Sequence, residues 1–279
     1  MGLSVSSSSP SAPGPLGPLG PPKLASSKGG SRAAKFVPPL ATVAVLLGLW
    51  QWLGNGSTIF PPPSRIMSAF WRTRALLPPH IATTLIETVL GTIVGVAGGV
   101  VVAVSTVALP LFGRAIQPIL IASQTVPVQI LSPILVLWFG FGLAPKVVVV
   151  ALVVFFPVAV STNAGLRAAD SETLDLVRSL GASKRQQFRF LSAPAALPAA
   201  LSGLRISLTY AVAAAAISES IGATSGLGLY IARSQRGFRY DQVFVGVLVV
   251  TALSILLFSV VYLLDRVLCP WRHGADGAS

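Results

Sequence analysis

The chain has 279 residues, of which 53% are hydrophobic and only 10% are charged, and its formal net charge is +12. Soluble domains carry about 25% charged residues, so this composition excludes an ordinary soluble domain and indicates an integral membrane protein. The basic residues lie between long apolar runs, where a positive-inside bias explains them better than nucleic-acid binding does.

Residues 1–35 are rich in Ser, Pro and Gly and cannot bury enough apolar surface to fold, so a disordered cytoplasmic tail is predicted. A long apolar run follows at 36–53, and then a polar stretch at 54–80. Within this stretch, residues 64–76 place large apolar side chains at helical spacing beside three arginines. That pattern predicts an amphipathic helix on the membrane surface and not a span.

The rest of the chain contains five further apolar runs, at about 82–108, 115–138, 144–165, 197–221 and 242–264. A spanning helix needs about 20 apolar residues, so the six runs together predict an all-α membrane protein with about six transmembrane helices. The run 115–138 contains three prolines and should be kinked or broken. Gly91, Gly95 and Gly99 recur at every fourth position, and small residues at this period let two helices approach closely.

The distribution of Lys and Arg predicts how the chain is oriented in the membrane. With the N-terminus inside, 13 of the 20 Lys and Arg residues fall in inner segments and 7 in outer segments. This excess predicts that both termini are cytoplasmic and that 54–80 lies outside.

The longest internal cytoplasmic segment of this topology is 166–196. Residues 171–180 predict a short amphipathic helix, which Gly181 ends. Ser183 can cap a second helix over 184–191, which ends before a proline. Two short helices braced at a glycine turn, directly before a span, form a compact element that suits the docking of a partner.

At this loop the sequence resembles the cytoplasmic EAA loop of the inner-membrane permeases of binding-protein-dependent ABC importers. The EAA pattern is Glu-Ala-Ala, three residues, Gly, nine residues, Ile, one residue and Leu-Pro. Asp175-Leu176-Val177, Gly181 and Leu191-Ser192-Ala193-Pro194 follow this spacing without a gap. The departures are Asp for Glu, Leu and Val for the two alanines, Leu for Ile, and Ala for Leu. The resemblance implies coupling helices that sit in a groove of the ATPase, with the coupling role on Asp175, Gly181, Ala182, Ser183, Leu191 and Pro194.

The resemblance extends over about residues 36–268. The segments that are similar to the sulfonate, taurine, nitrate and pyrimidine-precursor permeases are Phe60–Ser64, His80–Leu85, Pro133–Gly142, Gly203–Arg205 and Gly222–Gly228. The resemblance implies a type I ABC importer permease domain over 36–268, followed by a cytoplasmic tail at 269–279. It also implies a permease homodimer in the lipid bilayer, cytoplasmic ABC ATPase subunits, an extracytoplasmic substrate-binding protein and no cofactor. The transported solute would be a small pyrimidine-type thiamine precursor or a sulfonate-like or nitrate-like compound.

Glu87 and Glu219 lie near the outer ends of the second and fifth predicted spans, and carboxylates inside a membrane are functional candidates by default. One interpretation places them at the outer gate or against the solute. The other makes them interfacial carboxylates that bond to nearby hydroxyls such as Thr83, Thr84 or Ser218. If both acids face the pathway, they disfavour an anionic solute.

Two other functions compete with an ATP-driven permease. A membrane-embedded enzyme built on Ser225 would need a base, and no histidine lies in a later span. A secondary transporter typically shows internal repeats and paired ionisable residues, and it would leave the docking loop unexplained. The sequence has no Gly-x-x-x-x-Gly-Lys-Ser/Thr phosphate loop, so ATP would have to be hydrolysed by a partner.

Overall fold

The structure is a computed structural model that describes residues 32–123, 127–168 and 171–270. The chain divides into two compact units, Met1–Gly48 and Leu49–Ser279. Every regular element in the described residues is a helix, which confirms the predicted all-α class.

Helix α1 (Arg32–Gly54) is the only element described in the first unit, and its last turns belong to the second. It covers the predicted run 36–53 but begins four residues earlier, inside the segment 1–35 for which the composition predicts disorder. The two alanines at 33 and 34 have high helix propensity, which favours this earlier start. The rest of that tail, 1–31, lies outside the described residues.

The second unit is a bundle of helices. They are α2 (Pro63–Thr73), α3 (Leu77–Ala108), α4 (Pro110–Ser123), the short 3₁₀ turn η1 (Val128–Leu131), α5 (Ser132–Phe139), α6 (Leu143–Arg167), α7 (Ser171–Ser179), α8 (Lys184–Gln187), the π-helical turn η2 (Phe188–Ser192), α9 (Ala193–Glu219), α10 (Leu227–Arg236) and α11 (Tyr240–Leu268).

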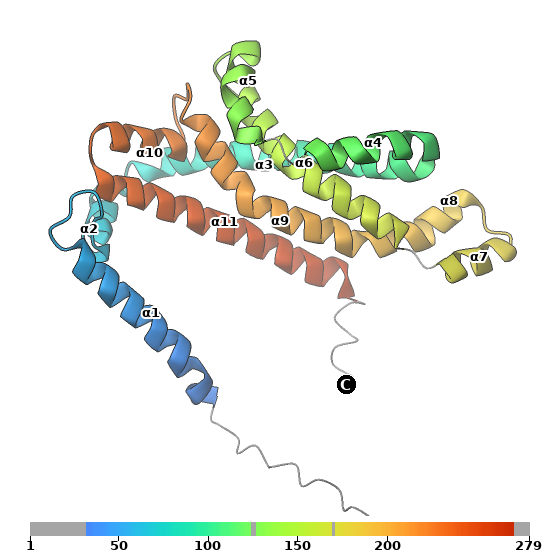
Figure 1. The fold of residues 1–279 in the computed structure, drawn as a ribbon, viewed down its shortest axis with the longest axis horizontal. Helices are drawn as coiled ribbons and strands as arrows, with labels where there is room; N and C mark the ends of the chain where they lie inside the picture. Colours follow the sequence, from blue (N-terminus) through green and yellow to red (C-terminus); the bar gives the residue numbers. More distant parts are fainter. Residues whose placement is uncertain (1–31, 124–126, 169–170, 271–279) are drawn as a thin grey trace, which may run out of the picture. The chain divides into compact units, whose positions relative to one another are not determined.

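The long helices α3, α6, α9 and α11 run side by side (Figure 1). Helix α6 packs against both α3 and α9, and α11 packs against α9. The central apolar cluster consists of Val150, Val154 and Val158 of α6, Leu208, Ala211 and Ala215 of α9, and Val261 of α11. Helices α2 and α10 lie at one end of the bundle, called here the α10 end, and α7 and α8 lie at the opposite, α7–α8 end (Figure 1).

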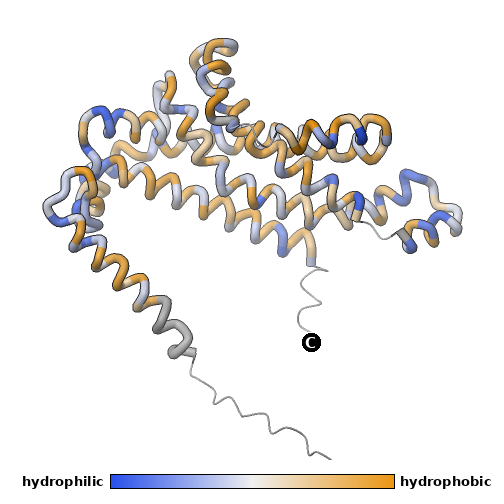
Figure 2. The backbone as a smooth tube through the Cα atoms, in the orientation of Figure 1, coloured by the Kyte–Doolittle hydropathy of each residue, from blue (hydrophilic) through white to orange (hydrophobic). Residues whose placement is uncertain are grey.

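Four helices among the described residues are long and apolar enough to cross a membrane. They are Leu77–Ala108, Leu143–Arg167, Lys184–Glu219 and Tyr240–Leu268, and they match four of the six predicted runs. Hydrophobic residues cover most of their length, whereas hydrophilic residues gather on α7 and α8 and around α10 (Figure 2). The polar ends are therefore the parts of the bundle that suit contact with water or with partner proteins.

The predicted run 115–138 is not one continuous helix. It is divided between α4 and α5, which η1 joins, and residues 124–126 lie outside the described part. This confirms the break that three prolines predict, because proline removes a helical hydrogen bond and clashes with the preceding turn.

The predicted amphipathic segment 64–76 forms helix α2. Its buried side chains, Ile66, Ala69 and Thr73, lie on one face, and α2 contacts α11. Met67 and Trp71 remain exposed. The helix therefore has an apolar face toward the bundle and a second face that is free to meet the membrane surface.

The structure corrects the expected end of the second loop helix. Four residues of α8 lead directly into the π-helical turn and then into α9, so the helix continues from Lys184 to Glu219. Pro194 lies in the first turn of α9 and does not interrupt it. The Ala193 N–H donates to the Phe188 carbonyl, a π-type bond that widens the helix just before the proline.

The glycine spacing of 82–108 has a definite partner, helix α6. A Cβ on Gly91 would lie 2.5 Å from the Val150 Cβ, and one on Gly95 would lie 2.6 Å from the Ala151 carbonyl oxygen. One on Gly99 would lie 2.9 Å from the Phe155 carbonyl oxygen. The predicted close approach of two helices is confirmed, because each glycine meets the backbone or a Cβ of α6.

Replacing Gly95 by valine should therefore destabilise the α3–α6 pair, by about 1–3 kcal/mol, the usual cost of overpacking a close contact. Ala97→Val is the matched control, because Ala97 lies on the exposed side of the same helix. The melting temperature of the purified protein in detergent measures the effect. Equal melting temperatures for the two variants would contradict this packing.

Candidate functional site

The loop between α6 and α9 forms a helix–turn–helix whose ends are defined by local hydrogen bonds. Gly181 has a φ of 84°, the left-handed conformation that glycine adopts without steric cost. Its N–H donates to the Arg178 carbonyl at 3.0 Å, and the Ala182 N–H donates to the Val177 carbonyl at 3.2 Å. These bonds close the C-terminus of α7 with the expected glycine cap.

Helix α8 begins with a reciprocal capping box. The Ser183 hydroxyl accepts from the Gln186 N–H, and the Gln186 side-chain oxygen accepts from the Ser183 N–H at 2.8 Å. The predicted cap at Ser183 is confirmed. Because both helix ends are capped by neighbouring residues, the turn between α7 and α8 has a defined shape.

Apolar side chains are exposed on the α7–α8 element, which is taken here as residues 171–192 and so includes the turn η2. Leu176, Leu180 and Phe190 have exposed fractions of 60%, 78% and 72%. Asp175 is exposed on α7, and Leu191 is half-buried. An apolar surface on a short polar helix pair, at the end of a membrane bundle, is typical of a protein docking site.

At the α10 end, Glu219 is fully buried and holds the start of α10. One oxygen of its carboxylate accepts from the Thr84 hydroxyl at 2.6 Å, and the other accepts from the Gly228 N–H at 2.6 Å. The Thr84 hydroxyl oxygen also accepts from the Leu227 N–H at 2.9 Å. A Cβ on Gly226 would lie 2.3 Å from the Glu219 carboxyl carbon, so only glycine fits there.

Two further contacts attach the start of α10 to α3 and α2. The His80 ring nitrogen Nδ1 accepts from the Gly226 N–H at 3.0 Å. The Tyr230 hydroxyl donates to the Thr73 hydroxyl at 3.2 Å. Burial raises the pKa of the Tyr230 hydroxyl above its ordinary value of 10.0, so this group stays a proton donor at neutral pH.

A pocket of about 250 Å³ lies beside this cluster, and two buried charged residues line it. Glu87 of α3 is 3% exposed and Lys146 of α6 is 2% exposed. The remaining lining comes from Thr83 and from two turns, Phe141–Leu143 and Gly222–Ser225. Glu219 holds α10 and is not part of this lining, but its carboxyl group lies beside that of Glu87 and interacts with it.

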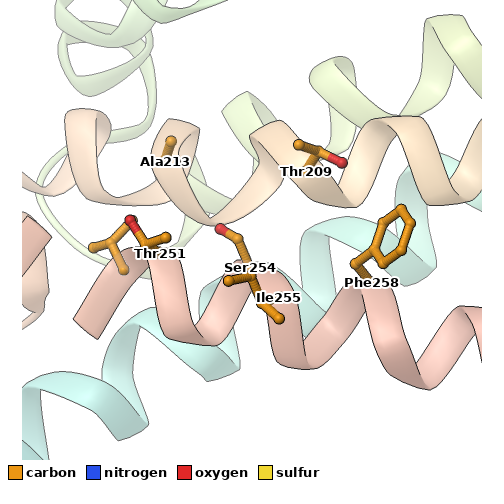
Figure 3. Close-up of a pocket in the computed structure, with 7 residues that line it drawn as sticks. Thr209, Ala213, Thr251, Ser254, Ile255 and Phe258 are labelled. Atoms are coloured by element: carbon orange, nitrogen blue, oxygen red, sulfur yellow. The ribbon is translucent and has the colours of Figure 1, made fainter. Parts of the chain in front are cut away.

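A larger hollow of about 400 Å³ lies between α9 and α11 (Figure 3). Its lining carries no charged residue. Its Thr209 and Thr251 hydroxyls donate to the Arg205 and Val247 carbonyls of their own helices. This hollow suits an apolar neighbour, such as a lipid chain, better than a polar solute.

Lys146 is not among the site residues predicted from the sequence, where it is only one of the seven Lys and Arg residues assigned to outer segments. A signal was present, because this lysine lies inside the apolar run 144–165, where a charge is costly and usually functional. Helix α10 and its attachment to Glu219 were also not predicted. The sequence around Glu219 and around Gly228 contains no pattern that indicates a contact between these two residues.

Known proteins resemble this chain over most of its length. The family of binding-protein-dependent transport system inner membrane components matches residues 95–272. The formylaminopyrimidine transport permease protein ThiX of Halalkalibacterium halodurans is 33% identical over 245 residues, covering 86% of this chain and 98% of that protein. The taurine transport permease TauC of Escherichia coli is 31% identical over 246 residues, with 84% and 89% covered.

The fold agrees with this relationship. A solved inward-facing structure of the MetNI methionine ABC transporter aligns with a TM-score of 0.56 at 21% sequence identity, covering 69% of this chain and 94% of that one. At this identity the likeness concerns the fold alone, and that fold is the one expected of type I ABC importer permeases. The chain is therefore a member of the binding-protein-dependent inner membrane component family, a multi-pass membrane permease subunit of an ABC importer.

Proposed function

We propose that this permease draws its energy from a separate ABC ATPase that binds the α7–α8 element. The observation that carries the proposal is the exposure of three apolar side chains around a capped helix pair: Leu176 on α7, Leu180 in the turn after it and Phe190 in η2. Helix α8 continues through the π-helical turn into α9. A displacement of α8 by the ATPase would therefore move the spanning helix with it. Rigid-body movement of packed helices is a common means of transmitting such a change.

The permease acts as a transporter and not as an enzyme, and its partners lie on both sides of the membrane. ATPase subunits bind in the cytoplasm at the α7–α8 end, and a substrate-binding protein delivers the solute at the α10 end. Two copies of the permease form the pathway between them. Both termini are cytoplasmic, as the 13 to 7 distribution of Lys and Arg predicts.

Accessibility of single cysteines to a membrane-impermeant maleimide tests this orientation. Ser179→Cys lies on the exposed surface of α7, and Thr224→Cys lies on the exposed turn before α10. In intact cells only Thr224→Cys should be labelled. In inverted vesicles Ser179→Cys should be labelled, and added ATPase should protect it. Native Cys269 is buried, and the unaltered chain measures its background. Labelling of Ser179→Cys from outside intact cells would contradict the proposed topology.

The solute is a small organic compound. Relatives carry names that refer to formylaminopyrimidine, taurine and aliphatic sulfonates. These compounds are small and polar, and the pocket beside Glu87 is of a size to hold one of them. Uptake of radiolabelled candidates by cells that express the full transporter identifies which one this permease carries.

A further inference from the structure

The α10 end buries an acidic and a basic side chain beside one pocket. Glu87 and Lys146 line the same pocket, but within the described part of the chain no ion pair joins them, and the two salt bridges there are Arg72–Asp241 and Arg205–Asp265. Removing one charge from water costs several kcal/mol even after relaxation. Ionisable residues inside a membrane protein therefore indicate a functional site.

Each of these two side chains keeps hydrogen-bonding capacity for a further partner. The Lys146 ammonium donates to the Gly142 carbonyl, which uses one of its three N–H donors. The Glu87 Oε2 is buried and accepts no hydrogen bond from the described residues. The neighbouring acid Glu219 interacts with Glu87 electrostatically and through a side-chain hydrogen bond, and it also accepts from Thr84 and Gly228. Glu87 and Lys146, and not Glu219, are therefore the ionisable residues of the pocket lining.

The pocket is large enough for a small solute and has polar groups at two places on its wall. A volume of about 250 Å³ holds about eight water-sized groups, at about 30 Å³ each. Glu87 comes from α3, and Lys146 comes from the first turns of α6. A ligand that satisfies both must carry a hydrogen-bond donor and an acceptor a few bonds apart.

We infer that this pocket binds the transported solute, and that the solute is amphoteric: an amino or ammonium group lies against Glu87, and an anionic or carbonyl oxygen lies against Lys146. This inference rests on the proposed function, since it places the site on the solute pathway. It replaces the expectation that two acids, Glu87 and Glu219, select against anionic groups. Glu219 holds α10, and the second ionisable residue of the pocket lining is Lys146.

Protection of a pocket cysteine from labelling tests the inference without altering either charge. Ala223→Cys lies in the pocket lining and is half-buried. Thr58→Cys is an exposed control outside that lining. The purified permease–ATPase complex in lipid vesicles is labelled with an impermeant maleimide in the presence of one of three probes. Taurine carries both an ammonium and a sulfonate. Isethionate has a hydroxyl in place of the ammonium, and ethanolamine has no sulfonate.

Taurine should protect Ala223→Cys about tenfold better than either one-ended probe, the factor that 1.4 kcal/mol of extra binding gives. No probe should protect Thr58→Cys. Two further variants are made in the Ala223→Cys background. With Lys146→Gln, taurine should protect the cysteine no better than ethanolamine does. With Glu87→Gln, taurine should protect it no better than isethionate does. Equal protection by the three probes, or protection by none, would overturn the inference. Co-purification of the ATPase with the same preparations tests the proposed function separately, because it does not depend on the pocket.

Discussion

Replacing Gly181 by valine should abolish ATP-driven uptake while leaving the amount of permease in the membrane unchanged. Gly181 has a φ of 84°, and a residue with a side chain loses about 1–2 kcal/mol in this left-handed conformation. A β-branched residue is disfavoured further there. The turn would change its conformation, and α7 would lose its position relative to α8. No membrane-spanning helix is touched, so insertion should be normal.

The control for this prediction is Gly181→Asn, because asparagine tolerates the left-handed region and a Cβ at Gly181 meets no atom within 4 Å. Asparagine should therefore retain most of the activity that valine removes. Co-purification of the ATPase and solute-stimulated ATP hydrolysis measure the two variants. Normal ATPase recovery, stimulation and uptake with valine would show that this loop is not the coupling element.

Replacing Glu219 by alanine should destabilise the α10 end of the permease, by about 1–3 kcal/mol. The carboxylate is fully buried and accepts from the Thr84 hydroxyl and the Gly228 N–H. Alanine removes both acceptors; the Thr84 hydroxyl can still donate to the His80 carbonyl at 3.1 Å, but the Gly228 N–H is left without a partner, which costs about 1–3 kcal/mol. The start of α10 would detach, which should lower the melting temperature of the protein and its recovery from membranes.

Glu219→Gln separates this structural role from a direct role in transport. The glutamine carbonyl can accept from the Gly228 N–H, and its amide can donate to the Thr84 hydroxyl oxygen, so the variant should assemble normally. Transport by this variant should change more than assembly does if Glu219 also affects the outer gate. A melting temperature of Glu219→Ala equal to that of the unaltered protein would contradict the role in holding α10.

The features that were predictable from the sequence depend on neighbouring residues. Long apolar runs predicted the four spanning helices, and prolines predicted the break between α4 and α5. The turn at Gly181 and the cap at Ser183 were also predictable, because each is formed by residues within a few positions. The coupling role of these residues remains a proposal.

The features that were not predictable depend on contacts between distant segments. Glu219 is 135 positions from Thr84, and the sequence offered this threonine only as one of several hydroxyls near the two acids. Lys146 and Glu87 line the same pocket because their helices, α6 and α3, pack closely at the glycines of α3. Pro194 was expected to end a helix, and the π-helical turn before it lets the helix continue.

The central claim is that a separate ATPase drives this permease, and uptake into sealed vesicles tests it most directly. Vesicles that contain the permease with its ATPase, loaded with ATP and supplied with the substrate-binding protein outside, should accumulate the solute without any ion gradient. Vesicles that lack the ATPase should not accumulate it, even when a proton or sodium gradient is imposed. Accumulation driven by a gradient in the absence of the ATPase would contradict the claim and would indicate a secondary transporter.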